Sequence, residues 1–263
     1  MRANYRRFDF ANSIERIKKS LRGQVSYNKS SDIPKLNDLT FKTGTYVNCA
    51  SLFIDLRGSS SLIEVYGKHP KTLARLYRAY ISEMVAIVNS FKSCQEVNII
   101  GDCVSAMFAG DQGKEKPVIE ALRAASLCNG MMQVLNAEFK KTWGYNFKEI
   151  EAGIGVALGQ ALVIKAGHSG TGIHDLVYMG DVVNKASKMC GLAHKEYNKP
   201  ICVTEAVYEN AGQVYANKMT RQTFQNFLTL ENHQEHGKIY TGSFARKSLR
   251  AWAKQNSDSN QQI

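Results

Sequence analysis

Long apolar runs are missing from the sequence, and their absence excludes the simplest membrane architecture. No stretch of the 263 residues approaches the roughly 20 apolar residues that a membrane-spanning helix needs. The basic N-terminus is followed by no apolar segment of the kind that a secretory signal contains. We therefore expect a protein without a membrane span and without a secretory signal.

Cysteine spacings typical of metal sites are missing as well. No C-x-x-C or related pattern joins the six cysteines of the chain. Reduced thiols fit this usage best, so we expect a cytoplasmic protein. The six positions are Cys49, Cys94, Cys103, Cys128, Cys190 and Cys202.

Signature motifs of several enzyme classes are also absent. There is no H-E-x-x-H, and His233 and His236 form only an H-x-x-H in a polar turn, which is typical of solvated side chains rather than of a zinc site. No Ser-His-Asp or Cys-His order can be assigned from the spacing, so a hydrolase is not indicated. The Walker A pattern G-x-x-x-x-G-K-[ST] does not occur.

What the sequence does contain is typical of an ordinary folded protein. Hydrophobic residues make up 44% and charged residues 22%, which argues against a disordered, collagenous or disulfide-stapled chain. The length suffices for one large domain with appendages, or for two small domains.

The formal net charge of +11 is concentrated at the two ends of the chain. Residues 1–40 carry nine Lys and Arg against four Asp and Glu, and residues 214–263 carry seven against three, whereas residues 41–213 carry eighteen against sixteen. A basic excess can indicate a nucleic-acid or acidic membrane partner. No aromatic-interleaved basic stripe or zinc-finger spacing accompanies it, so nucleic-acid binding is not expected as the main function. We divide the chain into a basic N-terminal extension (1–40), a central domain (41–213), and a C-terminal hairpin, helix and polar tail (214–263).

The apolar pattern of the central domain predicts alternating strands and helices. We expect strands at 46–56, 152–158, 161–164 and 201–204, hairpins at 96–108 and 224–244, and helices over about 73–88, 116–141 and 180–194. The Gly-rich stretch 167–172 is expected to be a loop. The order mixes hairpins with crossovers and predicts an α+β fold with a mainly antiparallel sheet and flanking helices.

Two aspartates end or interrupt predicted strands among apolar neighbours, where a lone carboxylate is costly to desolvate. Asp55 lies at the end of strand 46–56, and Asp102 lies in the turn of hairpin 96–108. If the strands are neighbours, the carboxylates converge on one sheet edge, where a pair of divalent cations such as Mg²⁺ or Mn²⁺ is the obvious partner. Alternatively, each aspartate caps a turn.

Two further segments suit a nucleotide. Gly58-Ser59-Ser60 lies between a strand and a helix N-terminus, whose free N–H groups form an anion site for phosphates. Asn184 and Lys188 are four residues apart, so both project from one helical face. An amide and a cation together can orient a sugar and stabilise charge on a phosphoryl group. The alternative for this pair is a solvated helix face.

Taken together, these segments resemble the catalytic domain of class III nucleotidyl cyclases. Residues 53–60 (F-I-D-L-R-G-S-S) resemble the first metal motif of that family, residues 98–103 (N-I-I-G-D-C) the second, and residues 180–188 the motif G-[ND]-x-V-N-x-A-[SA]-[RK]. The resemblance covers residues 46–204 and implies the ferredoxin-like fold of those cyclases for a catalytic domain at 41–213.

The resemblance also implies roles for individual residues. It implies Asp55, Leu56 and Asp102 as ligands of two divalent cations, and Asn184 and Lys188 as catalytic residues that position the ribose and stabilise the transition state. Lys188 stands where the family usually has Arg, which keeps the charge but loses the planar fork. A homodimer is implied, whose composite sites take the aspartates from one subunit and the Asn and the cation from the other. Contacts with the triphosphate substrate are implied for Leu56, Arg57, Gly58, Ser59 and Ser60.

The positions that read the base depart from the common pattern. Adenylyl cyclases typically carry Lys and Asp or Thr where this chain has Asn98 and Val177, and guanylyl cyclases typically carry Glu and Cys. Lost hydrogen-bond partners in a base pocket cost several powers of ten in discrimination. Neither ATP nor GTP is therefore expected to be the best substrate.

A single-domain cyclase with this replacement resembles the pyrimidine cyclases of bacterial Pycsar antiphage systems. The likeness implies cyclisation of UTP or CTP to the 3′,5′-cyclic nucleotide and pyrophosphate, with a product that activates a separate effector after phage infection. Asn98 offers a hydrogen-bond donor and an acceptor, so it can pair with either uracil or cytosine. We favour UTP as the substrate. Tyr46 and Tyr178 are candidates to narrow the pocket, or are simple packing aromatics.

Other functions stay open at this point. An adenylate cyclase would read adenine through other residues, and a catalytically silent cyclase-like module would bind nucleotide without turnover. A nucleic-acid-binding protein would show strongly salt-dependent affinity and no nucleotide turnover. The G-G-D-E-F signature is missing, so a diguanylate cyclase is not indicated.

Overall fold

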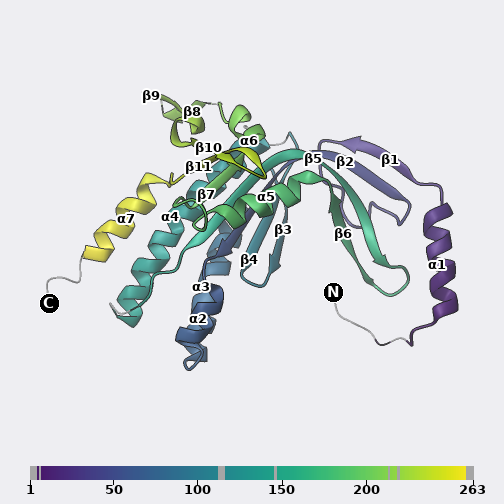
Figure 1. Ribbon diagram of the computed structural model, residues 1–263, viewed down its shortest axis with the longest axis horizontal. Coiled ribbons are helices and arrows are strands. Elements are labelled where there is room, and N and C mark those ends of the chain that lie inside the picture. The colour runs from purple at the N-terminus through teal and green to yellow at the C-terminus, as the bar shows by residue number, and fades with distance from the viewer. Residues whose placement is uncertain are drawn as a thin grey trace.

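A curved nine-stranded sheet forms the centre of the protein (Figure 1). The computed structural model describes residues 5, 7–111, 116–144, 147–212, 214–217 and 220–258. The strand order is β10-β11-β7-β5-β2-β4-β3, with β1 added beside β2 and β6 beside β5. The strands are β1 (Ser26–Ser30), β2 (Thr43–Leu56), β3 (Cys94–Ile100), β4 (Cys103–Phe108), β5 (Ala152–His168), β6 (Ile173–Met179), β7 (Ile201–Thr204), β10 (Thr229–His233) and β11 (Gly237–Gly242).

Most neighbouring strands of this sheet run antiparallel. The pairs β1–β2 and β5–β7 are parallel, and the other pairs are antiparallel. The predicted α+β fold with a mainly antiparallel sheet is therefore confirmed. A separate two-stranded sheet joins β8 (Val214–Asn217) to β9 (Thr220–Thr223).

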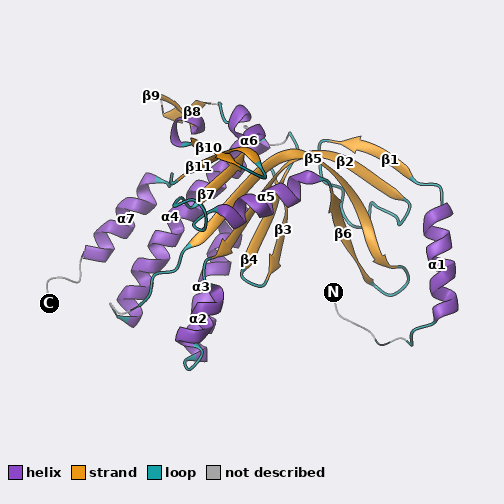
Figure 2. Cartoon of the chain, in the orientation of Figure 1, coloured by secondary structure: helices purple, strands orange, loops and turns teal. Residues whose placement is uncertain are grey.

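Helices cover both faces of the sheet (Figure 2). On one face, α3 and α4 pack against each other and enclose the larger core; on the other, α5 packs on β5 and β2. The helices are α1 (Phe10–Arg22), α2 (Ser59–Tyr66), α3 (Pro70–Val88), α4 (Pro117–Trp143), α5 (Asp181–Leu192), α6 (Glu205–Asn210) and α7 (Lys247–Asp258), with a 3₁₀ turn, η1, at Phe224–Phe227.

The alternation of side chains along β2 divides the core between these two faces. Leu52 and Ile54 are fully buried against the α3 and α4 side, where Tyr80 is also fully buried. Val47 and Cys49 point to the opposite face, which α5 covers. This period of two is what a strand buried on both sides requires, and it fixes on which face Asp55 emerges.

One strand assignment from the sequence is wrong. The predicted partner strands 152–158 and 161–164 form a single strand, β5, which pairs with β2 without interruption from Gly44–Ile164 to Leu56–Ala152. The true partner is β6, whose residues 173–179 follow the Gly-rich turn. Part of the predicted loop, 167–168, therefore belongs to β5. The Gly159-Gln160 pair resembles a turn sequence, but β5 continues through it because both residues remain paired with β2.

Two helices stand where one was predicted after the first motif. Gly67 ends α2, and Pro70 begins α3 at its first turn, where a missing N–H costs nothing. The remaining predicted helices and the final hairpin are confirmed as α4, α5 and β10–β11.

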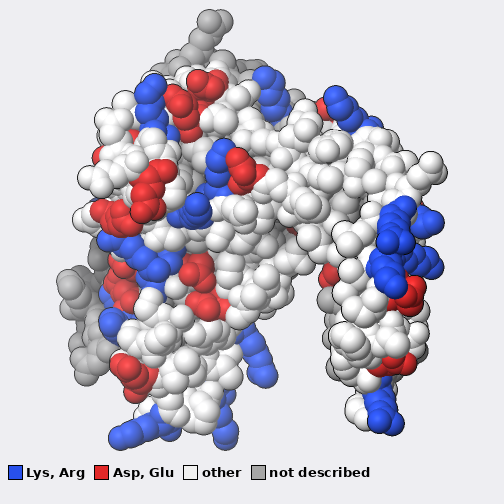
Figure 3. Space-filling view, turned by 45° about the vertical axis from the view of Figure 1, so that its right-hand side comes forward, with Lys and Arg blue, Asp and Glu red and all other residues white. Residues whose placement is uncertain are grey.

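The N-terminal part of the chain stands apart from the helical layers (Figure 1). Helix α1 has no buried residue, although it carries apolar side chains such as Leu21, which is 80% exposed. The lobe that includes α1 carries a cluster of basic side chains with acidic side chains beside it, and both kinds are interspersed on the body (Figure 3). The division of the chain at residues 40 and 213 stays a prediction, and residues 259–263 of the predicted polar tail lie outside the described part.

No helix in the described ranges combines the length and the apolar character that crossing a bilayer requires. All six cysteines are free thiols, and burial raises the pKa of Cys49 to about 12 and that of Cys190 to about 11. The buried thiols are therefore protonated at neutral pH.

Candidate active site

Asp55 and Asp102 lie at the same end of two neighbouring strands. β2 and β4 pair antiparallel, and the last registered pair is Ile54 with Val104. Asp55 follows Ile54 directly, and Asp102 lies in the turn that precedes β4, where Gly101 takes a φ of 64°. The β3–β4 hairpin thus places Asp102 at the same edge of the sheet as Asp55 of β2.

The electrostatic environment of Asp55 raises the pKa of its carboxyl group. Burial is the main cause that raises the pKa of Asp55 above its ordinary value of 3.8, and the charge of Asp102 is the next. The positive charges of Arg57 and Lys195 act in the opposite direction without cancelling this rise. Because burial and the charge of Asp102 both disfavour ionisation of Asp55, added positive charge is stabilising at this site.

Asp102 has an unsatisfied oxygen in the free protein. Its Oδ2 atom is buried and has no hydrogen-bond partner. Such an atom is costly to bury unless something binds it, and a divalent cation prefers carboxylate oxygens. The described residues contain no group of three or more His, Cys, Asp or Glu side chains suited to a metal ion. A cation here would therefore need further oxygens from the backbone or from a ligand.

Leu56 can contribute to such a site only through its backbone. Its aliphatic side chain is 2% exposed and belongs to the larger core. Its carbonyl oxygen is the atom that a hard cation could use. The predicted metal role of Leu56 thus reduces to one main-chain oxygen next to Asp55.

Arg57 joins the carboxylate edge to α5. Its Nη1 donates to Asp55 Oδ2 at 3.2 Å, and its Nη2 donates to the carbonyl oxygen of Cys190 near the end of α5. The side chain is 9% exposed. Gly153 on β5 leaves the space, because a Cβ atom there would overlap the guanidinium. Arg57 thereby ties the position of Asp55 to that of the helix.

The segment after Arg57 has the form of an anion site. Gly58 takes the left-handed conformation with φ 63°, and α2 begins at Ser59 without a side-chain cap on its first N–H groups. Gly58 and Ser60 are exposed, and Ser59 is partly exposed. Free N–H groups and the positive end of the helix dipole favour a phosphate at this point.

Asn184 and Lys188 both lie on the outer side of α5. Val182, Ala186 and Met189 face the sheet, so the two polar side chains project together into solvent. Within the part of the chain that the structure describes, neither makes a hydrogen bond or an ion pair to the aspartates. The helix thus presents both side chains to solvent.

Asn98 and Tyr178, two of the positions predicted to contact the base, both form a hydrogen bond with Glu96. Asn98 on β3 is exposed, and its Nδ2 donates to Glu96 Oε1 at 2.8 Å. Tyr178 on β6 donates its hydroxyl hydrogen to Glu96 Oε2, and burial is the main cause that raises the pKa of this tyrosine. Val177 is its neighbour and is 41% exposed. Strands far apart in the sequence therefore meet at the side chain of Glu96.

Tyr46 is not brought to the carboxylates of its own chain. It lies nine residues before Asp55 on β2, about 30 Å along an extended strand. Its ring packs edge to face on Tyr27 of β1, with ring centroids 6.2 Å apart. Its predicted contact with a nucleotide stays a prediction.

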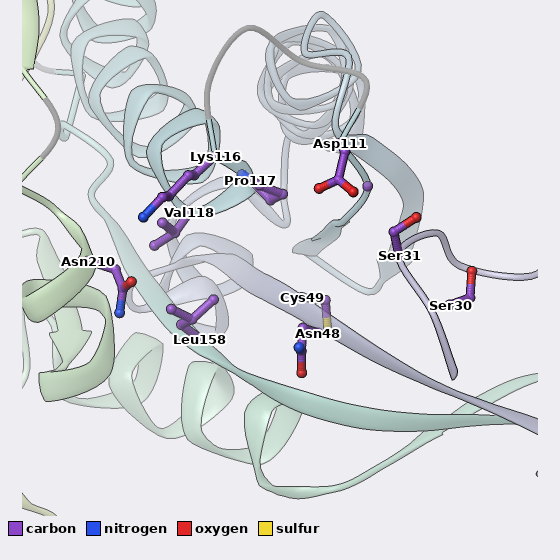
Figure 4. A pocket seen from close by; sticks show the side chains of 11 residues that line it. Ser30, Ser31, Asn48, Cys49, Asp111, Lys116, Pro117, Val118, Leu158 and Asn210 are labelled. Carbon is purple, nitrogen blue, oxygen red and sulfur yellow. The ribbon is translucent and has the colours of Figure 1, made fainter. Parts of the chain in front are cut away.

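A separate cavity of about 440 Å³ opens on another part of the molecule (Figure 4). Its lining comes from β1, β2, β5, α6 and the start of α4, and contains none of the predicted site residues. It is lined by Ser30, Ser31, Asn48, Cys49, Gly110, Asp111, Lys116, Pro117, Val118, Leu158 and Asn210. The candidate active site is therefore the exposed edge described above and not this cavity.

Comparison with known proteins agrees with this geometry. Residues 41–229 match the family described as the adenylate and guanylate cyclase catalytic domain. The protein belongs to this cyclase family. The cyclase chain is 62% identical over 258 residues to a uridylate cyclase of Gulbenkiania mobilis, covering 97% of this chain and 100% of the relative. It is 30% identical over 222 residues to a uridylate cyclase of Treponema porcinum, covering 84% and 75%.

A solved structure supports the cyclase fold. The adenylyl cyclase CyaB from P. aeruginosa superposes with a TM-score of 0.60 at 19% identity, covering 78% of this chain and 97% of that one. At this identity the likeness bears on the fold alone. The α+β class III cyclase architecture inferred from the three motifs is confirmed.

Sequence reasoning missed one residue of this site. Glu96 contacts both Asn98 and Tyr178, yet no motif contains it. A signal was present, because Glu96 precedes Asn98 by two residues on one strand and so shares its face. The contact with Tyr178 depends on the curvature of the sheet, which no local pattern reveals.

Proposed function

We propose that this protein is a uridylate cyclase that converts UTP to 3′,5′-cyclic UMP and pyrophosphate. The observation that carries the choice of substrate is the 62% identity to a uridylate cyclase along nearly the whole chain. Asn98 and Val177 agree with it, since neither supplies the hydrogen-bonding pair expected for adenine or guanine.

The reaction is an internal displacement at phosphorus. The ribose 3′-oxygen forms a bond to the α-phosphorus, the bond from that phosphorus to the bridging oxygen breaks, and pyrophosphate leaves in line. The hydroxyl proton passes to solvent or to the released pyrophosphate. Little covalent chemistry remains for the protein, so positioning and charge stabilisation carry the rate.

Asp55, Asp102 and the Leu56 carbonyl would hold two divalent cations, Mg²⁺ or Mn²⁺. The unsatisfied Asp102 Oδ2 and the raised pKa of Asp55 fit such ions. When bound, the cations supply a lowered pKa for the 3′-hydroxyl and charge neutralisation for the triphosphate. The N–H groups at Ser59 and Ser60 would receive phosphate oxygens, and the side chain of Arg57 holds Asp55 in place.

The active form is a homodimer with two composite sites. Asn184 and Lys188 project outward from α5 and would meet the aspartates of the other subunit. There the Asn184 amide would orient the ribose, and Lys188 would stabilise the charge on the transferring phosphoryl group.

The experiment is cyclisation of UTP by the purified protein with Mg²⁺ or Mn²⁺, followed by mass spectrometry. Asn184→Ala and Lys188→Ala should each lower the rate by about 10²- to 10³-fold, the usual cost of one lost transition-state donor. Lys185→Ala is a matched control, because it lies at a variable position of the motif and its ammonium pairs with Asp181 on the exposed surface of the same helix. Near-normal turnover in both the Asn184 and the Lys188 variant would contradict the assignment of the site.

We further propose that the product is a cytoplasmic second messenger in antiphage defence that acts on a separate effector. The resemblance to Pycsar cyclases supports this role. Bacteria that express the protein with its neighbouring genes should resist phage, and Asp55→Ala should remove the resistance. Protection that survives in the Asp55→Ala strain would separate defence from cyclisation.

A further inference from the structure

The side chain of Glu96 connects two residues of the proposed base pocket. Its Oε1 accepts a hydrogen bond from Asn98 Nδ2 at 2.8 Å, and its Oε2 accepts one from the hydroxyl of Tyr178. Glu96 and Asn98 share one face of β3, whereas Tyr178 lies on β6, 82 residues away in sequence. One carboxylate therefore holds an edge strand and the β5–β6 hairpin together.

This pattern fixes the orientation of the Asn98 amide. An ionised carboxylate only accepts hydrogen bonds, so Asn98 must turn its NH₂ group toward Glu96. Its Oδ1 atom is then directed away from Glu96 as an acceptor, on an exposed side chain. An asparagine without such a partner can present either atom to a ligand. Glu96 removes that freedom.

A fixed acceptor distinguishes the two pyrimidine bases. N3 of uracil carries a hydrogen and donates, whereas N3 of cytosine has a lone pair and accepts. An Oδ1 atom facing N3 forms a hydrogen bond with uracil and meets a second acceptor in cytosine. Once the base covers Asn98, an unsatisfied polar group costs about 1–3 kcal/mol, which corresponds to a preference of about 5- to 150-fold.

We propose that Glu96 is a positioning residue that makes the protein select UTP over CTP. It holds Asn98 with the amide oxygen toward N3 of the base and anchors Tyr178 beside it. Glu96 touches neither the reacting atoms nor the phosphates, and it acts through the two residues that it contacts. The inference rests on the proposed function and deepens it, since it names the group that sets the choice of base.

The test compares kcat/KM for UTP and for CTP in the wild type, Glu96→Gln and a matched control, Glu83→Gln. Glutamine can donate as well as accept a hydrogen bond, so the Asn98 amide is free to rotate and present either its oxygen or its NH₂ group to the base. The ratio of UTP to CTP should fall by about tenfold in Glu96→Gln. Glu83 lies on α3 and makes no hydrogen bond among the described residues, so its variant should keep the wild-type ratio. A merely structural role of Glu96 would lower both substrates equally.

Two further variants make the result decisive. Glu96→Ala removes both acceptors without adding a donor and should also lower the ratio. In an Asn98→Ala background, Glu96→Gln should lower it no further, because Glu96 acts through Asn98. A wild type that prefers UTP, with an unchanged ratio in both Glu96 variants, overturns the inference. A wild type that prefers CTP, or that cyclises neither pyrimidine, contradicts the proposed function instead.

Discussion

At the scale of single residues, the proposed site contains two carboxylates that are unfavourable in the free protein. Asp102 buries an oxygen without a partner, and Asp55 has a raised pKa because it is buried beside Asp102. Side chains of this kind weaken a fold unless something binds them. They are typical of positions that serve chemistry rather than stability.

Asp102→Asn should abolish cyclisation and leave the metal-free protein at least as stable as the wild type. The amide removes the negative charge that opposes ionisation of Asp55, so no folding energy is lost with it. Thermal unfolding should show that Mn²⁺ raises the Tm of the wild type and not that of the variant. Equal stabilisation of both proteins by Mn²⁺ would place the ion elsewhere.

The pH dependence of stability should depend on Asp55. Its pKa is raised in the folded state, so the folded protein binds this proton more tightly than the unfolded chain. The resulting stability is fully present below the unfolded pKa of about 3.9 and is lost as the pH rises through the folded value. In Asp55→Asn this loss is absent. Without metal, the difference in Tm between the variant and the wild type should therefore shift in favour of the variant as the pH rises from acidic to neutral. Parallel curves for the two proteins would contradict the raised pKa.

At the scale of elements, the close approach of α5 to β5 positions the helix that carries Asn184. A Cβ atom on Gly155 would lie 2.1 Å from the Cys190 nitrogen and 2.1 Å from the Ala186 oxygen, so the helix backbone rests directly on the strand. The same turn of α5 receives the guanidinium of Arg57. A small displacement of α5 would therefore move Asn184, and it would also move Arg57, which holds Asp55.

Gly155→Ala should destabilise the protein by about 1–3 kcal/mol through overpacking, and should lower the rate of cyclisation further than its stability explains. Gly191→Ala, on α5, is the control. Nothing lies within 4 Å of a Cβ atom there, so that change should be neutral or stabilising by up to about 1 kcal/mol. Chemical denaturation gives the stabilities, and turnover is measured well below the unfolding midpoint. If Gly155→Ala behaves like Gly191→Ala, the close contact is not as described.

The elements that could be predicted are those with a strong local pattern. The hydrophobic spacing of α3 and the turn at Gly101-Asp102 are local, and both were found. The identity of β6 was missed because His174 and Asp175, one on each face of the strand, interrupt its apolar pattern. The motifs identified Asp55, Asp102, Asn184 and Lys188 as candidates. The contacts of Arg57 with Cys190 and of Glu96 with Tyr178 join distant segments and required the fold.

At the scale of the whole molecule, the proposed site is divided between two surfaces of one chain. Asp55 and Asp102 occupy the edge of the sheet, and Asn184 and Lys188 project into solvent from α5. A two-fold dimer that brings the first pair of one subunit to the second pair of the other completes both sites at once. Exposed apolar side chains near the base positions, among them Ile100 and Met179, suit such a contact.

Mixing two inactive variants tests this division. Asp55→Ala and Lys188→Ala should each be inactive or nearly so as homodimers. A heterodimer keeps one site with an intact aspartate edge and an intact α5, so random exchange of subunits should restore about one quarter of the wild-type activity. Exchange is verified by native mass spectrometry. Full exchange without recovered activity would show that each chain builds its site alone.

The most direct test of the account is one competition assay. Purified protein is incubated with an equimolar mixture of ATP, GTP, CTP and UTP and with Mn²⁺, and the cyclic products are identified and quantified by mass spectrometry. We expect 3′,5′-cyclic UMP as the main product, cyclic CMP as a minor one, and no product from Asp55→Ala or Asp102→Ala. Cyclic AMP or cyclic GMP as the main product of the wild type would contradict it.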